Sequence, residues 1–351
     1  MNEPNNSEVN PLISVVIPAY NAESFVGHTL TSVLEQTYQN IEVIVIDDGS
    51  QDSTADIVKS FAKSDPRVIL VNQPNSGVSS ARNSGIYHSK GEFIAFIDAD
   101  DIYYPECLEK LTHAMLEADN SVGLVYTWSA HIDDEGNLTS GFNCSLVEEE
   151  VYEALLSRNF IGNASAALVR RCCIDKVGGY NSEMQPGCAD WDFYLRVAEH
   201  YQFKVVPEFL IGYRKLATSM SRSCAAMEKS YEQVLENAHK RNHNISTEFV
   251  STSKSFYFIY LNSQSRSNRR YVESINYLYK AASLKPGILL SFLFYKFLIV
   301  TFIEILTFPF TFLLWSDNIS WTNFKQKLRK TYYQVSNFSD LYELANKSLA
   351  R

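Results

Sequence analysis

The sequence has no paired cysteine motif, no glycine-rich phosphate loop and no basic surplus, and each absence excludes a class of protein. Its six cysteines show no C-x-x-C spacing, so reduced thiols are expected rather than a zinc site. Neither G-x-G-x-x-G nor G-x-x-x-x-G-K-[ST] is present in the first predicted loop, so dinucleotide and P-loop phosphate binding are unsupported. The formal net charge of -9 argues against nucleic acid as the main partner.

A secretory signal is also missing. Residues 1–11 are polar, with neither an apolar core nor a basic start, so we expect a disordered N-terminus and a cytoplasmic protein. The length of 351 residues allows one large domain with an extension, and the hydrophobic content of 46% is ample for a core.

What the sequence does contain is an apolar run that ends in carboxylates. Residues 93–97 have the length and composition of a strand buried in a parallel sheet. Asp98, Asp100 and Asp101 follow this strand, at the end where ligands of such sheets gather. These carboxylates either hold a hard divalent cation such as Mg²⁺ or Mn²⁺, or form a solvated acidic turn.

The first hundred residues alternate between strand and helix patterns. Such alternation predicts right-handed βαβ units and a mainly parallel sheet between helices. Polar residues follow the first, second and fourth strands, so we expect a nucleotide-sized site at their carboxyl ends. The strands are predicted at 13–17, 41–46, 68–71 and 93–97, and the helices at 22–37, 52–61 and 78–88.

The next residues continue this mixed pattern up to an amphipathic helix at about 189–198. That helix carries Asp190 and Asp192 in its first turn, where the helix dipole favours carboxylates in any protein. For Asp192 this structural interpretation is preferred. The other predictions are helices at 102–120 and 148–158, a hairpin or loop at 131–147, and strands at 122–128, 164–170, 203–206 and 210–214.

Five short motifs occur in the order and spacing of one family. They are Ile-Pro-Ala-Tyr-Asn at 17–21, Ile-Asp-Asp-Gly-Ser at 46–50, Ala-Arg-Asn-Ser-Gly at 81–85, Phe-Ile-Asp-Ala-Asp-Asp at 96–101 and Ala-Asp-Trp-Asp at 189–192. Together they resemble the family 2 glycosyltransferases of GT-A fold, and the resemblance implies such a domain at 12–225. It further implies inverting transfer from a nucleotide-diphosphate sugar, expected to be a UDP sugar. The acceptor would be a hydroxyl of a glycan or a lipid-linked molecule, as in cell-surface polysaccharide or lipopolysaccharide synthesis.

The resemblance assigns donor-side roles residue by residue. Arg82 would be the cation nearest the phosphates, and its structural alternative is an arginine on the outer face of a helix. Asp98 would contact the ribose or support the metal, and Asp100 would hold Mn²⁺ or Mg²⁺ at the diphosphate. The remaining donor-side residues are Pro18, Ala19 and Tyr20, which would line the base pocket, and Asp48, which would accept a hydrogen bond from the base.

On the acceptor side, Asp190 matches the general base of the family, although Ala189 stands where a glutamate is usual. Asp192 is the second candidate, and Trp191 is either an acceptor platform or a core residue. Leu216 stands where the family often has a metal-ligating histidine, so the metal would rest on Asp100 and phosphate oxygens. Arg214, Ser219 and Arg222 are expected in a loop that closes on the diphosphate.

Residues 226–351 lie outside the resemblance and are predicted to form a helical extension, with helices at 227–243, 249–262 and 271–284. The apolar segment 287–315 is interrupted by Lys296, Glu304 and Pro309, which leaves no uncharged run of the ~18 residues that a membrane span needs. Three alternatives stay open: an interfacial membrane helix, buried or homodimerising helices, or a true span. A basic cluster follows, so 287–330 is expected to contact the cytoplasmic leaflet.

Three rival interpretations are weaker. A processive polysaccharide synthase would carry Gln-x-x-Arg-Trp and several spans, and a sugar-1-phosphate nucleotidyltransferase would carry an N-terminal glycine-rich signature; the sequence has neither. An inactive nucleotide-sugar-binding or scaffold protein is disfavoured because Asp48, Asp100 and Asp190 occur together.

Overall fold

The computed structural model describes residues 10–216, 219, 222–290 and 294–303. The chain divides into two compact units, one that ends at Ile288 and one that begins at Leu289, and each is described by itself.

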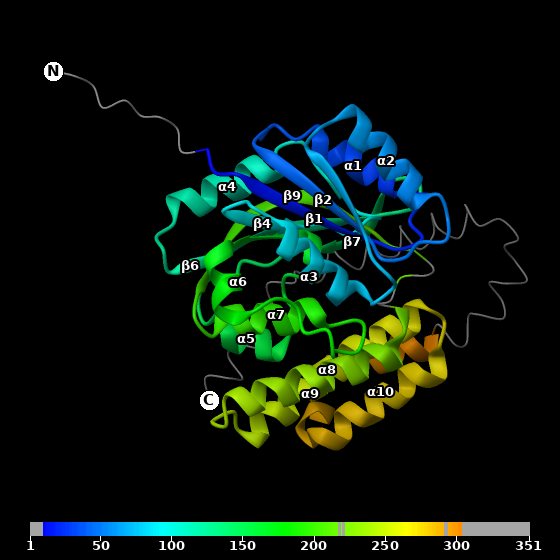
Figure 1. Ribbon diagram of the computed structural model, residues 1–351. Coiled ribbons are helices and arrows are strands. Elements are labelled where there is room, and N and C mark those ends of the chain that lie inside the picture. Colours follow the sequence, from blue (N-terminus) through cyan, green and yellow to red (C-terminus); the bar gives the residue numbers. More distant parts are fainter. Residues whose placement is uncertain (1–9, 217–218, 220–221, 291–293, 304–351) are drawn as a thin grey trace, which may run out of the picture. The chain divides into compact units, whose positions relative to one another are not determined.

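The first hundred residues build the parallel part of a nine-stranded sheet, in the order β3-β2-β1-β4. All residues of β1 and β4 are buried, as expected for strands covered by helices on both faces. Figure 1 shows α1 and α2 together on one side of these strands and α3 on the other. The elements are β1 (Ile13–Ala19), α1 (Val26–Leu34), β2 (Ile41–Asp47), α2 (Thr54–Ser64), β3 (Val68–Asn72), α3 (Val78–His88) and β4 (Phe93–Phe96).

The second part of the sheet is mixed. β8 (Ala167–Arg170) runs antiparallel to both β4 and β6 (Val122–Ile132), and β6 runs parallel to β9 (Gln202–Arg214). β5 (Ile102–Tyr103) pairs with β9 and β7 (Leu138–Asn143) with β6. The remaining elements are α4 (Cys107–Glu117), α5 (Val151–Ser157), a 3₁₀ turn (Ala164–Ala166), α6 (Arg171–Val177) and α7 (Ala189–Ala198).

Three sequence predictions of these elements were wrong in instructive ways. β1 continues through Pro18 because its pairing with β4 already ends at Val16, so the missing N–H breaks no bond on that side. β9 is one strand rather than two, because register shifts opposite Thr127 and Trp128 absorb the extra residues. The helix predicted from 102 begins only at Cys107, after the short strand β5.

Three helices follow the sheet: α8 (Cys224–Arg241), α9 (Thr247–Ser267) and α10 (Tyr271–Leu284), with α10 at its predicted bounds. They lie side by side at the bottom of Figure 1, and α8 and α9 contact α7 and α5 respectively. Ser223 and Ser246 cap α8 and α9, because each hydroxyl accepts a backbone N–H of the first turn. α9 extends to Ser267, beyond its predicted end, because the polar residues after 262 include the fully buried Ser265.

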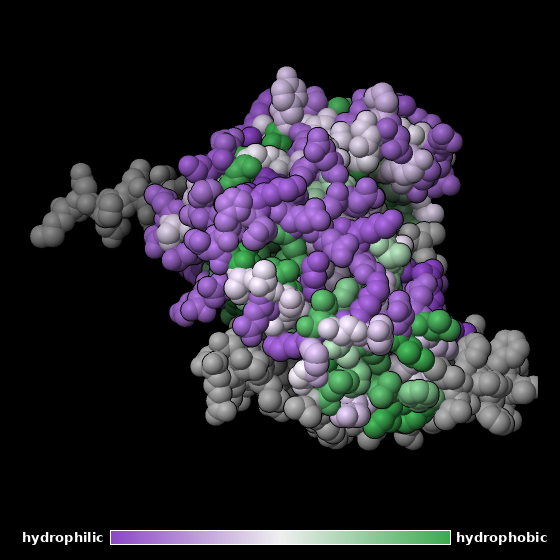
Figure 2. Space-filling view, turned by 90° about the horizontal axis from the view of Figure 1, so that it is seen from below, coloured by the Kyte–Doolittle hydropathy of each residue, from purple (hydrophilic) through white to green (hydrophobic). Residues whose placement is uncertain are grey.

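Apolar side chains are exposed on part of this helical region. Figure 2 shows hydrophobic residues gathered on the face seen from below. Val272 and Tyr279 of α10 are 84% and 71% exposed. Of the predicted apolar segment 287–315, residues 294–303 are helical and residues 291–293 and 304–315 lie outside the described part. Among the helices described, none has both the length and the apolar character that crossing a bilayer requires.

Candidate active site

Asp98 is the first side chain after the buried strand β4, and it pairs with an arginine from α3. Nη2 of Arg82 lies 2.5 Å from Oδ1 of Asp98, and the arginine side chain is only 6% exposed. Arg82 is therefore a buried partner of the carboxylate and not a surface arginine. The backbone N–H of Asp98 donates to the Ser165 hydroxyl at 3.1 Å, which fixes the end of the strand.

Asp101 is fully buried, and its carboxylate connects the end of β4 to the 3₁₀ turn and to β9. Its Oδ1 accepts the backbone N–H of Arg214 in β9 at 2.9 Å, and its Oδ2 accepts the Ser165 hydroxyl at 2.5 Å. The sequence offered Asp101 either as a cation ligand or as part of a solvated acidic turn. Because both carboxylate oxygens are engaged inside the protein, Asp101 holds the site together and is not the ligand that the sequence pattern offers.

Asp100 lies between these two carboxylates in the chain and is half-buried. Burial, followed by the negative charge of Asp98, raises its pKa to about 6. Within the described residues, no three His, Cys, Asp or Glu side chains gather as a ready cation site. The oxygens of Asp100, with Oδ2 of Asp98, suit Mg²⁺ or Mn²⁺, which take oxygen ligands and can complete their shells with phosphate oxygens and water.

The predicted base pocket lies at the ends of β1 and β2. Pro18 and Ala19 are buried in β1, whereas Tyr20 is 50% exposed and has a ring free to stack. Oδ1 of Asp48 accepts Gln73 Nε2 at 2.7 Å and the Ser76 N–H at 2.9 Å, and its Oδ2 accepts the Gly77 N–H at 2.8 Å. Asp48 therefore also holds the loop 73–77 in place, and its Oδ2 retains a lone pair for a further donor.

The motif Ala-Arg-Asn-Ser-Gly supplies packing contacts of α3 as well as the charge of Arg82. Asn83 clamps the backbone of Tyr180, donating from Nδ2 to its carbonyl and accepting its N–H on Oδ1, both at 2.7 Å. A Cβ at Gly85 would lie 2.2 Å from Cγ1 of Val16, so only glycine lets α3 lie this close to β1. The Arg82 guanidinium carbon then lies 5.0 Å from the centre of the Tyr180 ring.

Asp190 is in the first turn of α7 and reaches the same cluster. Burial raises its pKa, while the charge of Arg82 and a hydrogen bond from Asn159 lower it. Asn159 Nδ2 lies 3.1 Å from Oδ2 of Asp190. Sequence reasoning missed Asn159 because it lies outside every motif, in a segment whose position depends on tertiary packing. The ionisable groups whose charges interact with Asp190 are Arg82, Asp98, Tyr180, Cys188, Tyr194 and Tyr260.

The two neighbours of Asp190 that the sequence offered for the site face the protein interior. Asp192 is 1% exposed and its Oδ2 accepts Arg196 Nε at 2.9 Å, so the second candidate for the base is engaged in helix packing. Trp191 is 3% exposed, donates to the Leu155 carbonyl at 2.6 Å and stacks on Tyr231. Of its two predicted roles, these contacts favour the core.

The predicted diphosphate loop is only partly described. Arg214 is 2% exposed, and its Nε and Nη1 donate to the carbonyls of Asp100, Asp133 and Asp134 at 2.6–2.8 Å. These bonds place Arg214 beneath Asp100 as a support. Ser219 accepts the Leu216 N–H at 3.1 Å, and Arg222 is exposed, whereas residues 217, 218, 220 and 221 lie outside the described part.

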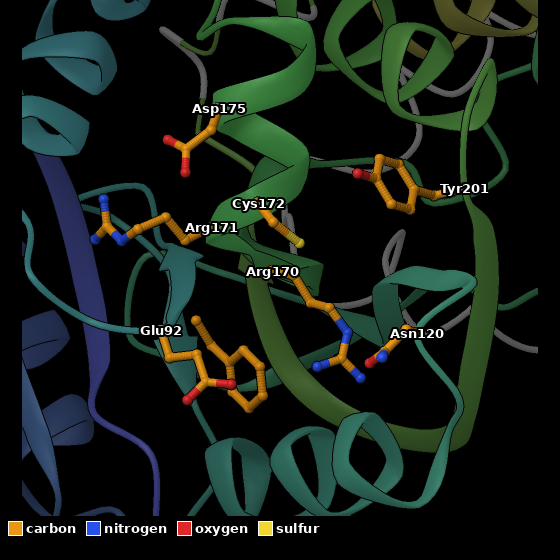
Figure 3. A pocket seen from close by; sticks show the side chains of 8 residues that line it. Glu92, Asn120, Arg170, Arg171, Cys172, Asp175 and Tyr201 are labelled. Atoms are coloured by element: carbon orange, nitrogen blue, oxygen red, sulfur yellow. The ribbon is translucent and has the colours of Figure 1, made fainter.

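A cavity of about 590 Å³ lies at the opposite end of β4, away from Asp98. In Figure 3, Arg170 extends towards Asn120 while Arg171 points away from it. The two guanidinium groups donate to the carbonyls of Val122, Met115 and Gly91 and to the Ser89 hydroxyl, at 2.6–2.9 Å. The cations beside this cavity are thus engaged in the fold, and the site is better sought at the carboxyl edge.

The chain is similar to known glycosyltransferases. Residues 14–177 match the family Glycosyl transferase family 2. The chain is 33% identical to the chondroitin synthase of Escherichia coli over 196 residues, which are 55% of this chain and 27% of that one. It is 27% identical to the chondroitin synthase of Pasteurella multocida over 269 residues, 76% of this chain and 24% of that one. The chain thus spans about a quarter of the length of either relative.

Two solved structures share the fold. The mannosyltransferase PcManGT from Pyrobaculum calidifontis, solved with GDP-Man and Mn²⁺, superposes with a TM-score of 0.53 at 18% identity, covering 85% of this chain and 88% of that one. S. aureus TarS 1-349 in complex with UDP-GlcNAc gives 0.51 at 16% identity, covering 78% and 90%. The fold is that of the GT-A transferases, as the motifs predicted. Over residues 14–177 the chain thus resembles the glycosyltransferases of family 2.

Proposed function

We propose that the protein transfers a sugar from a nucleotide-diphosphate sugar, a UDP sugar in the first instance, to a hydroxyl of a glycan or lipid-linked acceptor, with inversion. The observation that carries the proposal is the cluster at the carboxyl edge. There, the proposed base Asp190 lies in the electrostatic field of Arg82 and Asp98, the residues expected at the donor. Relatives that are chondroitin and hyaluronan synthases support a role in polysaccharide synthesis.

In this proposal Asp190 takes the proton of the acceptor hydroxyl. The hydroxyl oxygen forms a bond to the anomeric carbon from the face opposite the diphosphate, and the bond to the diphosphate oxygen breaks with its electron pair. Tyr20 stacks on the base and Arg82 keeps Asp98 in place. Asp100, with Asp98, would hold Mg²⁺ or Mn²⁺, which supplies charge stabilisation to the leaving diphosphate when bound.

The test is hydrolysis of a panel of nucleotide sugars: UDP-glucose, UDP-galactose, their N-acetylated forms and GDP-mannose, each with Mn²⁺ or with EDTA. We expect one donor to release its nucleoside diphosphate only with the metal, and to raise the melting temperature. When an acceptor alcohol is added, NMR of the glycoside formed should show a β-linkage from an α-linked donor. If no donor is hydrolysed and no nucleotide shifts the melting temperature, the inactive alternative is favoured instead.

We also propose that the segment 287–330 contacts the cytoplasmic leaflet. In the described helix 294–303, Tyr295, Ile299 and Phe302 are each at least 50% exposed, which suits an interfacial helix. The full chain should sediment with anionic vesicles, and Ile299→Glu with Phe302→Glu should weaken this sedimentation. A chain that stays in solution with vesicles but doubles its mass by light scattering would support a homodimer instead.

A further inference from the structure

α9 has contacts near the proposed catalytic residues on both sides of a tyrosine that no motif includes. At one anchor, Oη of Tyr257 lies 3.8 Å from Sγ of Cys188, two residues before Asp190. At the other, Asn268 Nδ2 donates to the Arg222 carbonyl at 3.3 Å. The helix therefore spans from the proposed base to the end of the proposed diphosphate loop, and Tyr260 lies between the two anchors.

Tyr260 lies beside Tyr257 on α9, and the Tyr257 hydroxyl approaches Cys188 near the start of α7. Tyr260 follows Tyr257 by three residues and precedes Gln264 by four, and positions three or four apart share one side of a helix. Even so, the Tyr260 side chain is 41% exposed, so part of it is accessible to solvent. Burial raises the pKa of its hydroxyl, and the charges of Cys188, Cys224 and Asp190 raise it further, so the hydroxyl is within electrostatic range of the proposed base.

The ring of Tyr260 is supported from behind by buried aromatic residues. Its centre lies 5.6 Å from that of Tyr257, at an interplanar angle of 31°. Tyr257 stacks on Tyr231 at 3.9 Å, and Tyr231 on Trp191 at 4.9 Å. The aromatic ring is thus held by packing, while part of its surface stays exposed.

We propose that Tyr260 is the platform on which a sugar ring of the acceptor glycan stacks, so that the helical region completes the acceptor side of the site. A pyranose has an apolar face of C–H groups that packs on an aromatic ring, while its hydroxyls stay in water. A ring held there would present a hydroxyl towards Asp190. This inference rests on the proposed function. It also gives α9 the role that the sequence had offered to the buried Trp191.

The test compares Tyr260→Ala, Tyr260→Phe and, as a matched control, Tyr279→Ala, which removes an exposed tyrosine from the outer side of α10. All are full-length chains, used with the nucleotide sugar that the wild type hydrolyses. The acceptor probes are a chondroitin hexasaccharide and the p-nitrophenyl glycosides of glucose, galactose, mannose and their 2-acetamido forms. The measured quantity is the ratio of transfer to donor hydrolysis, together with the acceptor KM.

For Tyr260→Ala we expect the ratio to fall and the acceptor KM to rise, each by about tenfold, with Tyr260→Phe and Tyr279→Ala close to wild type. An unchanged ratio and KM in Tyr260→Ala would overturn the platform. So would a wild type that hydrolyses the donor but uses none of the probe sugars, and the proposed donor chemistry would survive that result. A wild type that hydrolyses no nucleotide sugar would instead reject the proposed function itself.

Discussion

The donor side and the acceptor side that we propose for this site are built in different ways. The donor side is formed by loops that directly follow β1, β2 and β4, so its residues come in short, ordered motifs. The acceptor side is assembled from Asn159 before the 3₁₀ turn, Asp190 on α7 and Tyr260 on α9. These three positions span a hundred residues and meet only through tertiary packing.

This difference explains why motifs are informative on one side only. In a parallel sheet the chain returns to the same edge after every βα unit, so local patterns place side chains together. On the other side, the position of α9 depends on contacts such as Tyr257 with Cys188, which no local pattern encodes. Specificity for the acceptor can therefore vary while the donor motifs stay recognisable.

The largest effect is expected from Asp190→Asn, which should remove a function of the acceptor side and leave the donor side intact. The variant keeps the shape of the side chain but cannot accept the acceptor proton, so transfer should fall by about a thousandfold, in the range of lost general-base catalysis. Donor binding should persist, since Arg82 and Asp98 are untouched. The measurements are kcat for transfer and the nucleotide-induced shift in melting temperature. Loss of both transfer and nucleotide binding would show that Asp190 also contributes to the donor side.

Gly85→Ala, on the donor side, is expected to have a smaller effect, which is a loss of stability. The new Cβ would lie 2.2 Å from Cγ1 of Val16, so α3 must move away from β1, at a cost of about 1–3 kcal/mol of unfolding free energy. Gly27→Ala in α1 is the matched control, because its nearest neighbour would be at 3.8 Å. Chemical denaturation should show the control unchanged or slightly stabilised, by up to about 1 kcal/mol. Equal midpoints for the two variants would refute the close-packing explanation of the motif glycine.

Sequence reasoning recovered the parallel strands and α3 well, because their apolar patterns and glycines are local. The sequence did not reveal the structural role of Asp101. An aspartate that binds Ser165 and the Arg214 backbone looks identical in sequence to one that binds a cation. Arg214 was placed at the diphosphate for the same reason, whereas its guanidinium donates to backbone carbonyls beneath Asp100. Charged residues next to a site are thus the ones that sequence alone assigns least well.

The smallest expected effect concerns the positioning of the base by Asn159. Its amide donates to the ionised form of Asp190, so it lowers the pKa of that carboxyl against the rise that burial causes. The base acts when deprotonated, so Asn159→Ala should raise this pKa, move the acidic limb of kcat/KM to higher pH and reduce transfer about tenfold below that limb. Asn159→Asp adds a negative charge and should move the limb further in the same direction. Asn244→Ala, which changes an exposed asparagine in the turn between α8 and α9, is the control. If both Asn159 variants lose activity equally at every pH while Asp190→Asn is inactive, Asn159 supports the fold and does not tune the base.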